Sequence, residues 1–292
     1  MKVAVLTKGS TSDDAARYLL NNIEGVELVY HRIIADVFAS TAEGRTDYSV
    51  IPIENTIDGS VSLHTEILVN QVDLPIQAEW VYPSVQNLVG RLSELERSPE
   101  TGQLDYSPIV KVMSHPVAMA QCLQFIRQHM PDAELEHVST TADAIRIVRD
   151  NPGKGWVAIG QKTAAADHGL DVLQESVTDH DNNYTRFLLV GPKPLQGKVS
   201  DKHKTTIIVS NQEDYPGGLH QVLSALAWRR INMSRIESRP TKKRLGTYYF
   251  MIDIDMSMDS ILLQSAIAEI EAIGFQVRMM GSYPTFKYEP EA

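Results

Sequence analysis

The stretch TTIIVSNQEDYPGGLHQVLSALAW, residues 205–228, shows most directly how the chain folds. A run of apolar residues is followed by a turn-forming segment with two glycines, and then by residues with helical periodicity. This pattern predicts a strand at 205–210 and a helix at 216–228. The same rules predict two strands, a helix and a last strand at 232–240, 247–254, 257–273 and 275–283. The order βαββαβ is that of a ferredoxin-like sandwich.

The segment that precedes this domain has a different composition. Residues 192–203 are rich in lysine, proline and glycine and contain almost no apolar residues, which is typical of a linker. We therefore expect a domain at 204–285, joined by this linker to a larger domain at 1–191. A chain of 292 residues is long enough for two such domains.

The first 191 residues alternate short apolar runs with amphipathic stretches. Strands that alternate with helices indicate an α/β fold with a largely parallel sheet. A polar segment at 91–108, interrupted by proline and glycine, predicts an exposed insertion. The expected strands lie at 3–6, 26–30, 48–53, 109–113, 156–160 and 187–191, and the expected helices at 13–22, 117–129 and 141–150.

The composition excludes several classes of protein. Hydrophobic residues make up 43% and charged residues 22% of the chain, as in ordinary folded domains, so neither disorder nor a fibrous repeat is indicated. The net charge of −10 repels phosphate backbones and anionic lipid, so we expect no nucleic-acid or membrane partner. The sequence shows no signal peptide and no apolar run of membrane-spanning length, which predicts a cytoplasmic location.

The single cysteine, Cys122, excludes a disulfide within the chain. It lies in an apolar-periodic stretch, so a buried structural thiol is expected rather than a nucleophile. The histidines form no HExxH pair and no Cys/His cluster, and the acidic segment at 179–181 lies in a polar loop, where a solvated turn is expected. Glycine-rich phosphate-binding motifs are also missing. We therefore predict neither a metal site nor a cofactor.

Small hydroxyl and amide residues recur where predicted strands pass into helices. Such residues cap helices, and the free N–H groups of a helix N-terminus bind anions. Each group alone could be no more than a cap, whereas several that meet in one crevice would hold a small polyanion. Arg186, next to Thr185, is the fixed cation of this set and could bind a carboxylate in a bidentate manner. The groups are Ser10, Thr11 and Ser12; Asn55, Thr56 and Ser60; Ser114; and Ser139, Thr140 and Thr141.

Two longer segments carry a family resemblance. The run VIPIENTIDGSV at 50–61 and the run DHDNNYTRF at 179–187 resemble the two signature segments of prephenate dehydratases. In the C-terminal domain, PGGL at 216–219 and ESRP at 237–240 resemble the ACT regulatory domain that these enzymes carry. Shorter blocks occur in the family's order between the signatures, namely Ser114-His115-Pro116, Ala120-Gln121-Cys122 and Ser139-Thr140.

The resemblance implies a two-lobed catalytic domain, similar to type 2 periplasmic binding proteins, with the active site in the cleft between the lobes. The family converts prephenate into phenylpyruvate, carbon dioxide and water without a cofactor, as a step of phenylalanine biosynthesis. It assigns hydrogen-bond donation to the leaving hydroxyl to the threonine that matches Thr185. Glu54 would lie in a structural network, because a carboxylate beside a dianionic substrate raises the energy. The expected substrate-binding residues are Arg186, Phe187, Asn55, Ser12, Ser114 and Thr140.

The ACT resemblance implies that phenylalanine is an allosteric effector, held at a subunit interface. An ACT sheet leaves edge strands that a second copy usually covers, so we expect a homodimer or a homotetramer. The expected effector-binding residues are Gly217, Gly218, Leu219, His220, Glu237, Ser238 and Arg239.

The first loop departs from the family pattern, which is usually GPxGTFS. Here the loop is LTKGSTSDD at 6–14, with Lys8, Asp13 and Asp14 close to the start of the first helix. If that helix end faces the cleft, the two carboxylates would repel an anionic substrate. Two other functions stay open at this point. One is a prephenate decarboxylase that does not aromatise the ring, and the other is a sensor that binds an aromatic acid without chemistry.

Overall fold

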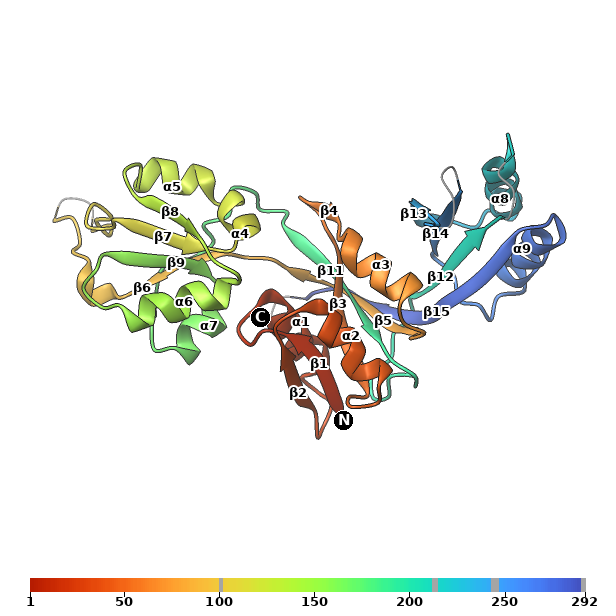
Figure 1. The fold of residues 1–292 in the computed structure, drawn as a ribbon, viewed down its shortest axis with the longest axis horizontal. Coiled ribbons are helices and arrows are strands. Elements are labelled where there is room, and N and C mark those ends of the chain that lie inside the picture. The colour runs from red at the N-terminus through yellow and green to blue at the C-terminus, as the bar shows by residue number, and fades with distance from the viewer. Residues whose placement is uncertain (100–101, 212–214, 243–246, 290–292) are drawn as a thin grey trace.

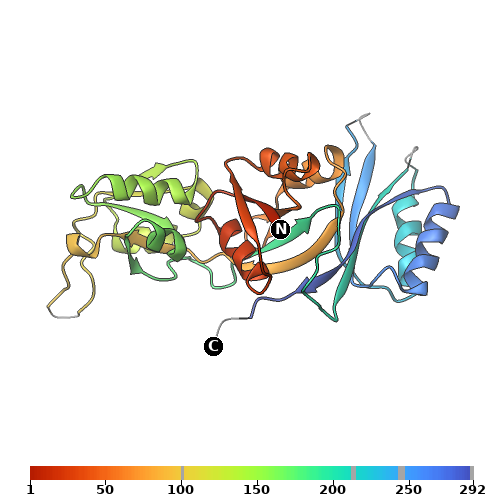
Figure 2. The same cartoon turned by 90° about the horizontal axis from the view of Figure 1, so that it is seen from below.

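The computed structural model describes residues 1–99, 102–211, 215–242 and 247–289. It contains two lobes and a C-terminal domain (Figure 1). One lobe, which we call lobe 1, lies in the middle of the molecule. The other lobe, lobe 2, and the C-terminal domain lie on its two sides, as the turned view in Figure 2 also shows. The predicted fold, a two-lobed α/β domain followed by a βαββαβ domain, is confirmed.

Lobe 1 contains β1 (Lys2–Leu6), α1 (Thr11–Leu20), β2 (Glu27–His31), α2 (Ile34–Ala42), β3 (Tyr48–Asn55), β4 (Gly59–Ser60), α3 (Ser62–Asn70), β5 (Ile76–Pro83) and β11 (Tyr184–Val190). Its sheet has the order β5-β11-β3-β1-β2. β1, β2 and β3 are parallel, so their carboxyl ends meet at one edge. β11 is antiparallel to both of its neighbours. The prediction of a largely parallel sheet holds for four of its five strands, β1, β2, β3 and β5, whereas β11 returns from lobe 2 and runs against β3 and β5.

Lobe 2 contains β6 (Asn87–Gly90), η1 (Leu92–Glu94), β7 (Lys111–Ser114), α4 (Pro116–Ala120), α5 (Leu123–His129), β8 (Glu134–His137), α6 (Thr141–Asp150), β9 (Trp156–Gly160), α7 (Lys162–Asp167) and β10 (Asp171–Gln174). Its sheet has the order β10-β6-β9-β7-β8 and is also mixed. The chain enters lobe 2 after β5 and leaves it before β11. Two connecting segments therefore join the lobes.

The helix predicted at 117–129 is two helices, α4 and α5. The second one has its own N-terminal cap, because the Asp179 carboxylate accepts hydrogen bonds from the N–H groups of Gln124 and Phe125. Asp179 is thus a helix cap and not part of a merely solvated turn. Cys122 lies between the two helices and is fully buried, as predicted, and burial raises the pKa of its thiol.

The C-terminal domain contains β12 (His203–Ser210), α8 (Gly218–Ala227), β13 (Met233–Pro240), β14 (Tyr248–Ile254), α9 (Ile261–Ala272) and β15 (Gln276–Phe286). Its strand order is β13-β14-β12-β15, and both helices cover the same face (Figure 2). β15 continues into lobe 1 and pairs with β5, so one sheet runs through both units. Gly281 is required at this crossing, because a Cβ atom there would lie 2.4 Å from the carbonyl oxygen of Ile76. Most of the hairpin turn expected at 242–246 lies outside the described residues.

Within the described residues, none of the helices combines the length and the apolar character that crossing a membrane requires.

Candidate active site between the lobes

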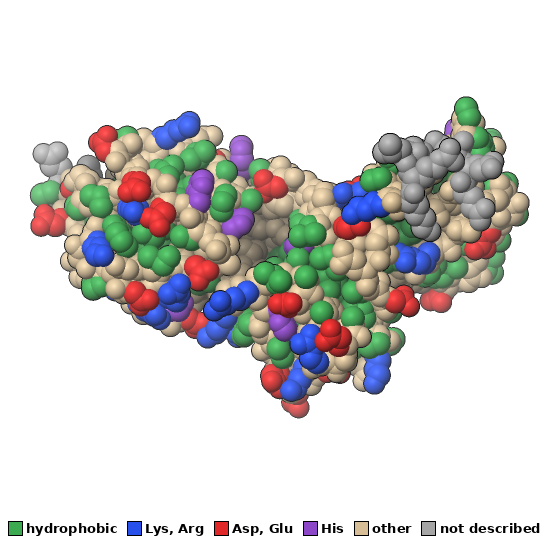
Figure 3. All heavy atoms as spheres, in the orientation of Figure 1, with side chains coloured by type: hydrophobic (Ala, Val, Ile, Leu, Met, Phe, Trp, Pro, Cys, Tyr) green, Lys and Arg blue, Asp and Glu red, His purple; other side chains and the backbone are tan. Residues whose placement is uncertain are grey.

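A cleft of about 660 Å³ lies between lobes 1 and 2. It is visible in Figure 3 as a hollow between the two lobes, where backbone and side chains that are neither charged nor hydrophobic predominate. The N-terminal ends of α1, α3 and α6 border it. The predicted hydroxyl and amide groups that do meet here are Ser10, Thr11, Ser12, Asn55, Ser60, Ser139, Thr140 and Thr141.

Thr185 lies at the centre of a hydrogen-bond network in this cleft. Its Oγ1 atom lies 3.0 Å from Asn55 Nδ2 and 2.6 Å from Ser84 Oγ. Asn55 Nδ2 also donates to Asn183 Oδ1 at 2.8 Å. Asn183 Nδ2 in turn donates to Gln121 Oε1 at 2.8 Å. The network therefore joins β3 and β11 of lobe 1 to Gln121, the residue that ends α4 in lobe 2.

The direction of the hydrogen bond to Thr185 follows from the backbone. Asn55 Oδ1 accepts from the N–H groups of Ile57 and Asp58 at 2.8 and 3.1 Å, which places Nδ2 on the side of Thr185. Thr185 accepts a hydrogen from Asn55, so its own hydroxyl hydrogen must go elsewhere. It can point to Ser84 or to a molecule bound in the cleft.

Strand geometry decides which residues of β11 face the cleft. Successive side chains of a strand point to opposite faces, so Thr185 and Phe187 line the cleft whereas Arg186 does not. On the paired strand, a bulge brings Asn55 and Pro52 to the cleft side. Phe187 stacks on Trp80 at 5.5 Å between ring centroids and forms a firm apolar wall.

The placement of Arg186 corrects the expectation that it binds substrate. Its side chain is 11% exposed and points away from the cleft. The guanidinium bonds to Glu79 through Nε at 2.8 Å, to Asp253 at 2.7 Å and to Glu54 at 3.3 Å. Lys204, which belongs to the C-terminal domain, forms an ion pair with Glu79 at 2.6 Å. Arg186 thus holds lobe 1 to that domain, and Glu54 lies in a structural network.

Charge balance explains why Arg186 stays in this position. Burial disfavours its charge, but Asp253 and Glu79 outweigh burial and raise the pKa of Arg186 well above its ordinary value. Asp253 is fully buried on β14 and also accepts from the Thr206 hydroxyl at 2.7 Å. The guanidinium is therefore the counter-charge of two buried carboxylates and is not available to a ligand.

Ser114 also lies outside the cleft, contrary to expectation. It is fully buried at the end of β7, and its hydroxyl donates to the carbonyl oxygen of Ile159 at 2.9 Å. This bond links β7 to β9 below the cleft, so Ser114 fastens the sheet of lobe 2 and does not touch a ligand there.

The first loop borders the cleft through Ser10, Thr11 and Ser12 and also packs against lobe 2. Lys8 pairs with Asp167 at 2.8 Å, and Thr11 Oγ1 accepts from Gln161 Nε2 at 3.0 Å. Asp14 Oδ1 accepts from the hydroxyl of Thr163 at 2.6 Å. Asp13 accepts from the N–H of Gly9 and from Arg17 and Tyr30. Lys8 and Asp14 therefore contact lobe 2, whereas Asp13 is bonded within lobe 1, and neither carboxylate lines the cleft.

Asp14 makes the stability of this contact depend on pH. Burial of the carboxylate raises the pKa of Asp14 from 3.8 to about 6. The negative charges of Asp13 and Asp167 also raise it, whereas the hydrogen bond from Thr163 and the positive charge of Arg17 lower it. The folded state thus holds the proton more tightly than the unfolded state, so stability falls as pH rises from about 4 to above 6. We expect Asp14→Asn to raise the free energy of unfolding by about 2–3 kcal/mol at pH 8 and by little at pH 4.

Urea unfolding followed by circular dichroism at both pH values tests this expectation. Asparagine keeps the oxygen that accepts from Thr163, so the hydrogen bond survives the substitution. Asp36→Asn, at an exposed position of α2, is the control and changes stability by no more than about 0.5 kcal/mol. A gain from Asp14→Asn of equal size at both pH values would show that burial of the charge is not its cause.

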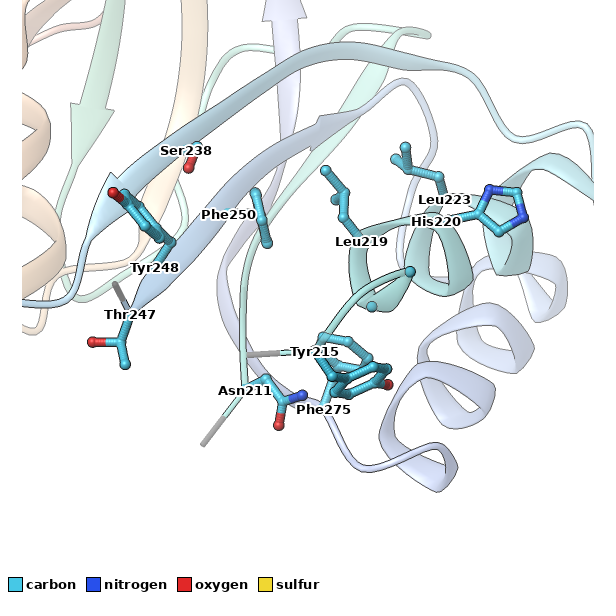
Figure 4. Close-up of a pocket in the computed structure, with 12 residues that line it drawn as sticks. Asn211, Tyr215, Leu219, His220, Leu223, Ser238, Thr247, Tyr248, Phe250 and Phe275 are labelled. Atoms are coloured by element: carbon cyan, nitrogen blue, oxygen red, sulfur yellow. The ribbon is translucent and has the colours of Figure 1, made fainter. Parts of the chain in front are cut away.

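A second pocket of about 470 Å³ lies in the C-terminal domain. Leu219, Leu223 and His220 come from α8, and Ser238 and Tyr248 come from the strands opposite (Figure 4). Gly217, with φ of +89°, forms the turn before α8, a conformation that glycine adopts without strain. Of the predicted effector-binding residues, Gly217, Gly218, Leu219, His220 and Ser238 line this pocket.

Glu237 and Arg239 do not line this pocket, because they alternate with Ser238 along β13. Both point to lobe 1. Arg239 donates to Ser62 Oγ at 2.9 Å, and Glu237 accepts from the Ser60 hydroxyl at 3.1 Å. Ser60 and Ser62 border the cleft. The expectation that Glu237 and Arg239 bind an effector is thus corrected: one strand presents Ser238 to the second pocket and its two neighbours to the edge of the cleft.

Several cleft residues were not predicted from the sequence. His115 and Gln121 occur in the short family blocks, which is a signal that could have found them. Ser84 and Arg32 directly follow β5 and β2, and Gln86 lies three residues after β5. Their only signal is that each is a polar residue soon after a strand. Gln86 is 4% exposed, and its Oε1 atom has no partner in the part of the chain that the structure describes.

In the described ranges, no group of three or more His, Cys, Asp or Glu side chains could hold a metal ion.

Comparisons with known proteins match both parts of the chain. The family model described as prephenate dehydratase matches residues 4–195, and the ACT domain model matches residues 205–272. A prephenate dehydratase from Bacillus subtilis (strain 168) is 36% identical and aligns with 90% of this chain and 92% of its own length. Two solved structures align with nearly the whole chain. One is a prephenate dehydratase from Arthrobacter aurescens in complex with L-Phe (TM-score 0.82, 29% identity, 97% of this chain and 89% of that one). The other is GqqA, described as a novel type of quorum quenching acylase (TM-score 0.81, 25% identity, 98% of each chain).

Proposed function

The chain belongs to the prephenate dehydratase family, and we propose that it converts prephenate into phenylpyruvate, carbon dioxide and water in the cleft between its lobes. The observation that carries the proposal is the hydroxyl of Thr185, which accepts from Asn55 and keeps its hydrogen for Ser84 or for a bound molecule. The family assigns the departure of the hydroxyl group to a threonine in this sequence context. Incubation of the protein with prephenate, followed by the ultraviolet spectrum of phenylpyruvate, tests the proposal.

The reaction needs one hydrogen-bond donor at the leaving hydroxyl. As the ring carboxylate departs as carbon dioxide, its bonding electrons move through the ring and the bond from the opposite carbon to the hydroxyl breaks. The hydroxide takes up one proton, which the solvent supplies over the complete cycle, and leaves as water. A threonine hydroxyl is too weak an acid to do this alone, so Thr185 acts as an oriented donor that Ser84 can resupply with hydrogen. Aromatisation of the ring supplies the driving force.

The walls of the cleft suit a dianionic ring compound. The first turns of α1 and α6 present N–H groups next to Ser12 and Thr141, and these favour negative charge. Phe187 and Pro52 provide apolar surface for the ring.

Two alternative functions are distinguished by the same spectrum. A decarboxylase that does not aromatise the ring would yield a product without the absorbance of phenylpyruvate, and a sensor would leave prephenate unchanged. The arrangement around Thr185 favours the dehydratase, because neither alternative needs a donor that is held by both Asn55 and Ser84.

We propose that the pocket of the C-terminal domain binds L-phenylalanine as an allosteric effector. Support comes from the Arthrobacter relative, which was solved with L-Phe, and from the aromatic and aliphatic lining of the pocket. β13 links this pocket to the edge of the cleft, since Ser238 faces one and Glu237 and Arg239 face the other.

Gly218→Val tests the effector site, because a side chain there would enter the pocket 3.2 Å from Phe275. We expect phenylalanine to bind tenfold or more weakly, as overpacking costs about 1–3 kcal/mol. Ser238→Ala weakens binding roughly fivefold through loss of one polar contact. Isothermal calorimetry measures both. Ser234→Ala, at an exposed position of the same strand outside the pocket, is the control. Wild-type affinity in Gly218→Val would place the effector elsewhere.

We also propose that the protein works as a homodimer or homotetramer in the cytoplasm. The outer edge of β13 pairs with no strand among the described residues, and a second copy could cover it. A mass near 32.6 kDa in light scattering would contradict the assembly.

A further inference from the structure

Arg32 occupies the edge of lobe 1 where the parallel strands end. It follows β2 directly, beside the carboxyl ends of β1 and β3, and its side chain is exposed and borders the cleft. In α/β sheets, small molecules bind outside the carboxyl ends of parallel strands. The position of Arg32 is therefore that of a ligand-binding residue and not of a core residue.

Arg32 also stands apart by its charge. Among the described residues that line the cleft, it is the one lysine or arginine, and its guanidinium has no hydrogen-bond or ion-pair partner within the described ranges. The one carboxylate of the lining, Asp58, accepts from Gln121 at 2.8 Å. Arg186, the other arginine near Thr185, is taken up by Glu79 and Asp253. Among the described residues, Arg32 is therefore the one lysine or arginine of the cleft that can pair with a bound dianion.

We infer that Arg32 binds the carboxylate of the pyruvyl arm of prephenate and not the ring carboxylate. The inference rests on the proposed function. The ring carboxylate loses its charge as carbon dioxide leaves, so a cation beside it would stabilise the ground state more than the transition state and would slow the reaction. The pyruvyl carboxylate keeps its charge throughout, and binding it anchors the substrate at no cost to the chemical step.

Distance along the sheet supports this assignment. β11, which carries Thr185, and β2, which precedes Arg32, are three strand spacings apart in the order β11-β3-β1-β2. At the usual spacing this is roughly 14 Å. The hydroxyl and the pyruvyl arm lie at opposite ends of prephenate. Prephenate and an arginine side chain are each several bonds of about 1.5 Å long. Their combined length spans the distance between β11 and β2. Thr185 at one end and Arg32 at the other would orient the ring between Phe187 and the helix N-termini.

Arg32→Gln and Arg32→Lys in the full chain test the inference with two probes. Phenylpyruvate keeps the pyruvyl carboxylate and lacks the ring carboxylate, whereas phenylacetone lacks both. We expect Arg32→Gln to weaken phenylpyruvate binding in calorimetry roughly 10- to 100-fold, because a charge-assisted bidentate bond is lost. Arg32→Lys weakens it less, and binding of phenylacetone does not change. KM for prephenate rises in parallel, while kcat stays within about threefold.

Arg45→Gln is the control, an exposed arginine of lobe 1 that pairs with Glu43 outside the cleft. Unchanged phenylpyruvate affinity in Arg32→Gln overturns the inference, as does a rise of kcat together with KM for prephenate, which would place Arg32 at the ring carboxylate. If the wild type converts prephenate but Arg32→Gln binds phenylpyruvate normally, the inference alone fails. If the wild type binds phenylpyruvate through Arg32 and leaves prephenate unchanged, the proposed function fails and the inference stands.

Discussion

Replacement of Thr185 with alanine lowers kcat for prephenate by about 10²- to 10³-fold, the usual effect of deleting one donor to a developing negative charge. KM changes little, because the hydroxyl contributes mainly in the transition state. The structure supports this expectation, since Asn55 donates to Thr185 and leaves the threonine hydrogen free to act on the leaving group. Steady-state kinetics measured by the absorbance of phenylpyruvate provide both constants.

Thr185→Ser is the matched variant. It keeps the hydroxyl and its contacts with Asn55 and Ser84 and should retain much of the activity. Ser84→Ala removes the neighbour that can resupply the hydrogen, and we expect its loss to be smaller than that of Thr185→Ala. Turnover of Thr185→Ala at the wild-type rate would show that the leaving group takes its proton from another source.

Replacement of Arg186 with methionine lowers the free energy of unfolding by about 3–5 kcal/mol, since it leaves buried carboxylates without a counter-charge. Asp253 is fully buried and Glu79 is nearly so, and Lys204 reaches Glu79 from the other side. Because the network joins β5 and β11 to β12 and β14, the loss also separates lobe 1 from the C-terminal domain. Urea unfolding followed by circular dichroism measures the change.

Arg186→Lys keeps a positive charge and tests the same network in a protein that remains folded. We expect it to be less stable than the wild type with KM for prephenate unchanged, because Arg186 does not border the cleft. Arg45→Met, at an exposed position, is the control and stays within about 0.5 kcal/mol. A large rise in KM for Arg186→Lys at wild-type stability would restore the role in substrate binding that the sequence suggested.

Arg186 shows where motif reasoning misleads. Thr185, Arg186 and Phe187 are adjacent in a signature segment and were assigned to one site, yet they belong to a strand, so the middle residue must face the other way. The same alternation separates Ser238 from Glu237 and Arg239. Once the strands were predicted, the sequence also predicted that successive side chains alternate between the two faces of each strand. What it could not reveal is that the opposite faces point to another domain of the same chain.

Ser114 and the first loop show a different limit. Ser114 precedes a helix, as expected of an anion-binding residue, but its hydroxyl bonds to Ile159 on the neighbouring strand. Asp14 stands in the first turn of a helix, and the neighbour that it meets, Thr163 of lobe 2, is distant in sequence. A local pattern predicts that a side chain lies near a helix end. It does not predict which way the side chain turns.

The sequence by itself determined the order of strands and helices in the C-terminal domain, about half of those in the lobes, the buried Cys122 and the family, because periodicity, turn residues and contiguous motifs are local properties of the chain. Only the tertiary structure decided that Arg32 borders the cleft, that Ser84 completes the surroundings of Thr185 and that Arg186 holds the C-terminal domain in place. Each of these depends on segments about 50 to 150 residues apart that meet because strands pair across the sheet, and the energy of such pairing resides in no single stretch of sequence.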